Sequence, residues 1–188
     1  MDNLPSLTEV VRNYDLGTNK KLGQHFLLDM NLTDKIARLA TPLEGVNVIE
    51  IGPGPGGLTR ALLINEAASV TVIEMDERFL PALADIGRAS GDRLSVIKGD
   101  ALKFDIAANI SAPRKIVANL PYNVGTKMLI NWVTETPRFW DQMVLMFQKE
   151  VAERVCAAPG ENAYGRLAVL CQSVAECHMA FDIPARSF

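Results

Sequence analysis

Residues 46–57 read Val-Asn-Val-Ile-Glu-Ile-Gly-Pro-Gly-Pro-Gly-Gly, an apolar run that leads directly into a glycine-rich turn. The β-branched run over 46–51 predicts a buried strand, and the residues after the turn predict a helix over 58–68. Because glycine has no Cβ, the backbone at Gly52 and Gly54 can approach a ligand closely. The stretch therefore predicts a strand, a turn and a helix, with a nucleotide-like ligand at the turn or, alternatively, a tight turn that binds nothing.

The pattern on either side of this stretch predicts an α/β fold. Short β-branched runs alternate with helical segments, which is typical of a mostly parallel sheet covered by helices on both faces. Further strands are expected over 70–73, 94–97, 116–118, 142–148 and 179–183. Further helices are expected near 8–13 and over 32–41 (capped by Asn31), 77–88, 124–134, 149–157 and 165–176. The length of 188 residues suits one such domain.

Composition argues against several classes of protein. No apolar run reaches the roughly 18 residues that a membrane-spanning helix needs, and the N-terminus has no features of a secretory signal. Cys156, Cys171 and Cys177 form no CxxC pair, so we interpret them as reduced core thiols of a cytosolic protein. Only two histidines, His25 and His178, are present and no carboxylates cluster, so no metal site is expected.

The charge balance bears on nucleic-acid binding. A net charge of −3 and a pI of about 5.4 argue against a broadly basic binding domain. Basic residues still recur along the chain and leave two interpretations open, a local basic face or solvated helix faces. These residues are Lys20, Lys21, Arg114, Lys115, Lys127, Arg138, Lys149, Arg154, Arg166 and Arg186.

Four polar or glycine positions fall at the carboxyl ends of predicted strands: Gly52, Glu74, Asp100 and Asn119. In parallel sheets, ligands bind at that edge. Glu74 lies 22 residues after Gly52, a distance that suits a carboxylate accepting bonds from both ribose hydroxyls. Nicotinamide dinucleotides and S-adenosylmethionine both carry such a ribose. Asp100 can accept a bond from an adenine amine or, alternatively, cap the turn that follows it.

Asn119-Leu120-Pro121-Tyr122 distinguishes between these cofactors. A dehydrogenase needs an acid–base residue near the nicotinamide, and we find none placed for it. A methyltransferase acting on an exocyclic amine needs two acceptors for the amine hydrogens, which the Asn119 side chain and a backbone carbonyl near Leu120 supply. Pro121 fixes that backbone, and Tyr122 can stack on the base. In isolation, the same four residues would be read as an ordinary turn.

Taken together, these motifs resemble the small-subunit (16S) ribosomal RNA adenine N6-dimethyltransferases. The resemblance runs from about residue 12 to 188 and implies a Rossmann-like class I S-adenosylmethionine-dependent methyltransferase fold. The matching segments are Lys21–Leu27, Glu50–Thr59, Val72–Asp76, Gly99–Ala101, Asn119–Asn123, Gln148–Arg154 and Tyr164–Leu167.

The resemblance also implies roles for individual residues. Catalysis is expected at Asn119, Leu120, Pro121 and Tyr122, with Phe188 flanking the target base opposite the tyrosine. Contacts to S-adenosyl-L-methionine are expected from Gln24, His25, Leu27, Gly52, Gly54, Glu74, Met75, Asp100, Ala101 and Asn119. His25 stands where many family members carry Asn, but a ring nitrogen can still donate to the donor carboxylate.

The implied reaction dimethylates two adjacent adenosines near the 3′ end of small-subunit rRNA and yields S-adenosyl-L-homocysteine without a metal. The implied partner is rRNA within an immature small ribosomal subunit in the cytoplasm, bound by a monomeric enzyme with a role in ribosome biogenesis and no membrane attachment.

The resemblance suggests a division of the chain. Residues 1–30 are expected to form an N-terminal arm that contributes to the cofactor site, and residues 31–188 the catalytic domain. The family continues past the position of Phe188 with a proline-rich segment, a last strand and a small helical domain. This chain therefore looks like a truncated catalytic domain, from which we expect an exposed sheet edge, donor binding and weak RNA methylation.

Three other interpretations stay open. A related antibiotic-resistance class methylates large-subunit rRNA and shares the glycine and Asn-x-Pro motifs, although Gln148–Arg154 and Tyr164–Leu167 favour the small-subunit family. A ribosome-assembly factor could depend on binding more than on turnover. A nicotinamide oxidoreductase would be favoured by tight NAD binding without S-adenosylmethionine binding.

Overall fold

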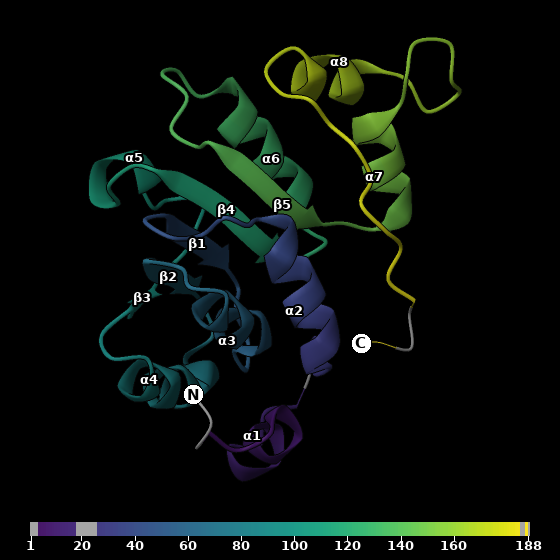
Figure 1. Cartoon of the computed structure of the whole chain (residues 1–188). Helices are drawn as coiled ribbons and strands as arrows, with labels where there is room; N and C mark the ends of the chain where they lie inside the picture. The colour runs from purple at the N-terminus through teal and green to yellow at the C-terminus, as the bar shows by residue number, and fades with distance from the viewer. Residues whose placement is uncertain (1–3, 18–25, 185–186, 188) are drawn as a thin grey trace.

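The computed structural model describes residues 4–17, 26–184 and 187 and is built on a five-stranded sheet (Figure 1). The strand order is β3-β2-β1-β4-β5, and every neighbouring pair is parallel. The strands are β1 (Asn47–Ile51), β2 (Ser69–Glu74), β3 (Leu94–Lys98), β4 (Arg114–Asn119) and β5 (Gln142–Met146). The predicted α/β fold with a parallel sheet is therefore confirmed.

Helices cover both faces of the sheet. One buried cluster joins the sheet to α1, α2, α3 and α4, and a second joins its other face to α5, α6 and α8. The helices are α1 (Leu7–Asn13), α2 (Met30–Leu39), α3 (Gly57–Ile64), α4 (Leu80–Ala89), α5 (Ile106–Asn109), α6 (Gly125–Thr134), α7 (Lys149–Cys156) and α8 (Arg166–Gln172). Some details differ from the prediction: α3, α8 and β5 are shorter, a 3-10 turn (Glu77–Phe79) precedes α4, and α5 was not expected.

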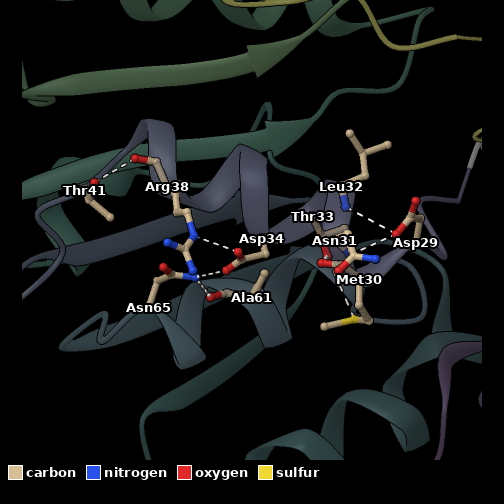
Figure 2. Close-up of polar contacts among 10 residues, drawn as sticks. All are labelled: Asp29, Met30, Asn31, Leu32, Thr33, Asp34, Arg38, Thr41, Ala61 and Asn65. Atoms are coloured by element: carbon tan, nitrogen blue, oxygen red, sulfur yellow. Dashed lines mark hydrogen bonds and ion pairs between the residues drawn. The ribbon is translucent and has the colours of Figure 1, made fainter.

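The cap of α2 also differs from the prediction. Asp29, not Asn31, caps this helix: its Oδ1 accepts from the backbone N–H of Asn31 at 2.9 Å (Figure 2). Both residue types favour caps, and the sequence does not show which one takes the extended backbone that a cap requires. Asp34 on α2 then accepts from Asn65 Nδ2 at 2.7 Å, a bond that fixes α2 against the end of α3.

The prediction of a strand over Met179–Ile183 is wrong, since among the described residues this segment belongs to no sheet. Residues of β5 and of this segment both line a cavity of about 1,210 Å³. Side chains hold the segment instead. The ammonium of Lys35 lies 3.8 Å from the ring centroid of Phe181, and Lys149 Nζ lies 2.7 Å from Asp182 Oδ2.

A buried carboxyl group joins β1 to α3. Glu50 is 2% exposed, and the Thr59 hydroxyl donates to its Oε2 at 2.6 Å. Burial raises the pKa of Glu50 to about 8, because the charged form loses its hydration. At pH values below that, the folded protein therefore holds Glu50 in its neutral form.

Replacing Glu50 with Gln is expected to reduce the pH dependence of the free energy of unfolding. The folded-state pKa of Glu50 is raised, so its stabilising contribution is complete below the ordinary value of 4.5 and is lost as the pH rises toward about 8. The corresponding slope is at most about 1.4 kcal/mol per pH unit. Urea unfolding of both proteins across this range measures it, with the exposed Glu44→Gln as the control. Equal slopes in the wild type and Glu50→Gln would contradict the prediction.

Candidate functional site

The glycine turn after β1 adopts a backbone that side chains disfavour. Gly52, Gly54 and Gly56 have φ values of +63°, +54° and +88°, in the left-handed region. A Cβ placed on Gly52 would lie 3.9 Å from Pro121 Cγ, so the turn lies beside the segment that follows β4. The sheet has thus brought the first and fourth strand ends together, as the sequence predicted.

Glu74 ends β2 and is held against the glycine turn. Its side chain is 6% exposed, with Oε2 accepting from Gly54 N at 3.2 Å and Oε1 from Asp76 N at 2.8 Å. Burial raises the pKa of Glu74, and backbone donors at Asp76, Gly54 and Met75 oppose that rise. Each carboxylate oxygen has a second lone pair, so Glu74 retains the capacity to accept from a vicinal diol.

The end of β3 lies next to the end of β2, since Gly99 N donates to Glu74 O at 2.9 Å. Asp100 Oδ1 accepts from Leu102 N at 3.0 Å, so the turn-capping role left open by the sequence is present. That bond occupies one oxygen, and the adenine contact of Asp100 stays a prediction. Met75 is 63% exposed and Ala101 is half-buried.

The segment after β4 leads directly into a helix. Asn119 is the last residue of β4 and pairs with Met146 of β5. Leu120 is buried, whereas Tyr122 is 37% exposed. The carbonyl of Pro121 accepts from Gly125 N at 2.8 Å and therefore starts α6. Asn119 and Tyr122 both line the cavity beside β5, where a flat ring has room to approach them.

The segment before α2 closes the other side of the glycine turn. A Cβ on Gly54 would lie 3.3 Å from the Phe26 ring, and a Cβ on Gly57 would lie 2.5 Å from the carbonyl oxygen of Leu27. Phe26 also meets Phe79 edge to face, with 5.4 Å between ring centroids. No role was predicted for Phe26 from the sequence, although its place as the aromatic residue of the Lys21–Leu27 motif was a signal that it could matter. The predicted contacts at Gln24, His25 and Phe188 lie outside the described residues.

Some of the basic residues have structural roles. Lys115 Nζ donates to the carbonyls of Ala40 and Pro42, and the Arg114 guanidinium donates to those of Ile110, Phe139 and Ala107. In contrast, four cations of α6, α7 and α8 are exposed: Lys127, Lys149, Arg154 and Arg166. Of these, Lys149 is paired with Asp182.

Within the described parts of the chain, no group of three or more His, Cys, Asp and Glu side chains is arranged to hold a metal ion. No helix in residues 4–17 or 26–184 has the length and apolarity to cross a membrane.

The sequence matches known proteins along its length. The family model described as ribosomal RNA adenine dimethylase matches residues 16–188. "Ribosomal RNA small subunit methyltransferase A" of Maricaulis maris is 56% identical over 190 aligned positions, which cover 100% of this chain and 66% of that protein. The protein of the same name from Sinorhizobium medicae is 54% identical, with 100% and 69% covered. The chain spans about two thirds of the length of these relatives.

Solved structures agree with this match. A dimethyladenosine transferase from Plasmodium falciparum superposes with a TM-score of 0.69 at 32% identity, covering 79% of this chain and 52% of that one. The 23S rRNA methyltransferase ErmE superposes with a TM-score of 0.64 at 28% identity, covering 77% and 56%. The fold is therefore the Rossmann-like fold of class I methyltransferases. The chain belongs to the ribosomal RNA adenine dimethylase family of S-adenosylmethionine-dependent methyltransferases.

Proposed function

We propose that this chain transfers methyl groups from S-adenosylmethionine to the N6 amines of two adjacent adenosines near the 3′ end of small-subunit rRNA. Its partner is the immature small subunit in the cytoplasm, to which it binds as a monomer. The observation that supports the proposal is the closeness of Gly52 to Pro121, since a Cβ on Gly52 would lie 3.9 Å from Pro121 Cγ: the glycine turn lies beside the segment that we propose binds the amine.

The donor half of the site uses the ends of three strands. The Glu74 carboxylate accepts from the ribose hydroxyls, and the backbone of Gly52 and Gly54 lies under the donor. Asp100 accepts from the adenine amine, while Met75 and Ala101 pack beside the ring. Leu27, with Gln24 and His25, faces the amino-acid tail. When bound, the donor supplies an activated methyl group on a sulfonium, so no residue has to activate a leaving group.

The acceptor half has to orient a weak nucleophile. The lone pair of an adenine amine is delocalised into the ring. Asn119 Oδ1 and a backbone carbonyl near Leu120 accept the two amine hydrogens and favour a pyramidal nitrogen with its lone pair directed at the methyl group. Tyr122 stacks on the base, with Phe188 on the opposite face. The N–C bond forms as the S–C bond breaks, and the amine proton leaves to solvent. Alignment supplies most of the rate enhancement.

Two alternatives can be separated from this proposal. ErmE shares the fold, but the more similar relatives carry small-subunit names at 53–56% identity. Purified immature small subunits and large-subunit rRNA, each incubated with labelled donor, distinguish the two substrates. Label confined to large-subunit RNA would contradict the proposal. Subunit maturation supported by an Asn119→Ala variant that cannot methylate would show that binding is the essential role.

Asn119→Ala is expected to lower kcat for methyl transfer by about 100-fold, the usual cost of removing one preorganised polar contact to a reacting group. Donor affinity should change much less, because Glu74 and the glycine turn remain. Single-turnover transfer of labelled methyl groups and calorimetric donor titration measure the two effects. Asn131→Ala, an exposed position on α6, is the control. A fall in donor affinity equal to the fall in kcat would contradict the assignment.

Glu74→Gln is expected to weaken donor binding roughly tenfold or more, since a charged acceptor for the ribose is lost. The pKa of Glu74 is raised, so in the wild type the carboxylate protonates, and donor affinity falls, at a higher pH than for an ordinary Glu of pKa 4.5. The variant should lack this pH dependence. Calorimetric titration at several pH values tests both points, with the exposed Glu77→Gln as the control. Parallel pH profiles in wild type and Glu74→Gln would refute the role.

A further inference from the structure

The buried cation Arg60 joins the N-terminal arm to the helix that follows the glycine turn. The residue is 7% exposed, and Nη1 donates to the backbone carbonyl of Pro5 at 2.6 Å. Burial lowers the pKa of Arg60, while the negative charge of Asp85 opposes that change. Removing a guanidinium from water costs free energy, and the hydrogen bond to Pro5 offsets part of that cost. We call this bond between Arg60 and the Pro5 carbonyl the latch.

The arm is anchored at this point by packing as well. Ser6 and Glu9 form a reciprocal capping box at the start of α1. Leu7 and Val10 are each 2% exposed. A Cβ on Gly57 would lie 2.9 Å from Leu7 Cδ1, so the first turn of α3 is in direct contact with α1.

A continuous set of contacts leads from this latch to the donor site. A Cβ on Gly57 would also lie 2.5 Å from the Leu27 carbonyl oxygen, and a Cβ on Gly54 would lie 3.3 Å from the neighbouring Phe26 ring, so both glycines lie directly against this segment. Gly54 N then donates to Glu74. The position of the arm is thus transmitted through close-packed atoms to the carboxylate expected to bind the ribose.

We propose that Arg60 is a positioning residue for the donor: by holding Pro5, it keeps α1 and the Phe26–Leu27 segment against the glycine turn in the shape that binds S-adenosylmethionine. This inference rests on the proposed donor site but not on the identity of the RNA. Because binding and positioning are reciprocal, donor binding should in turn make α1 more rigid.

Calorimetric titration of the whole chain with S-adenosylmethionine tests the inference. Arg60→Met removes the guanidinium and keeps an apolar side chain, and it should raise the donor Kd roughly tenfold. Arg60→Lys, which can still donate to the Pro5 carbonyl, should recover most of that loss. If Arg60→Met does not fold, Leu7→Ala provides a second test, because it weakens the packing of α1 against Gly57. This variant should also raise the donor Kd.

A matched control separates positioning from general destabilisation. Val133→Ala removes buried apolar volume from α6, on the opposite face of the sheet. At a temperature well below the melting temperature of every variant, its donor Kd should stay within about twofold of wild type. Amide hydrogen exchange in Leu7–Asn13 should slow when donor binds to the wild type and not when it binds to Arg60→Met.

The outcomes distinguish the two proposals. Wild-type protein that fails to bind the donor would overturn the proposed function and this inference together. Wild-type binding combined with an Arg60→Met effect no larger than that of Val133→Ala would overturn the inference alone. An amide exchange rate in α1 that does not change when the donor binds to the wild type would also overturn the inference alone. A selective loss in Arg60→Met, rescued by Arg60→Lys, supports the latch.

Discussion

The buried carboxylate of Glu74 is the group on which the geometry of the site depends. It leaves water at the end of β2, and the backbone N–H groups of Gly54 and Asp76 compensate for part of that cost. The glycine turn cannot move away without leaving a buried acceptor unpaired. This carboxylate, together with the bond from Gly52 N to the Ile73 carbonyl at 2.9 Å, holds the turn at the edge of the sheet, where Gly52 lies beside Pro121.

Parallel topology explains why distant motifs meet. β1 lies in the middle of the sheet and pairs with β2 on one side and β4 on the other. All strands point the same way, so Gly52, Glu74 and Asn119 end at one edge although they are widely spaced in sequence. The donor half of the proposed site therefore lies at the ends of β1, β2 and β3, and the acceptor half lies beside it at the end of β4.

Charge acts in two ways in this molecule. Among the described cations, Arg60, Arg93, Arg114 and Lys115 donate to backbone carbonyls, whereas other cations are exposed on α6, α7 and α8. The exposed cations provide positive charge that attracts a polyanion, whereas the cations that donate to carbonyls stabilise connections between segments. A net charge of −3 therefore says little about any single face.

The sequence by itself determined the fold class, the order of the strands along the chain and the four strand-end positions, because hydrophobic periodicity and glycine are local signals. It did not determine that Asp29 rather than Asn31 starts α2, or that residues 179–183 join no sheet, since both depend on which neighbour is in reach. It did not show that Phe26 packs on Gly54 or that Arg60 donates to Pro5. Contacts between segments far apart in the chain arise only when the sheet and the arm pack together, and only the tertiary structure decided them.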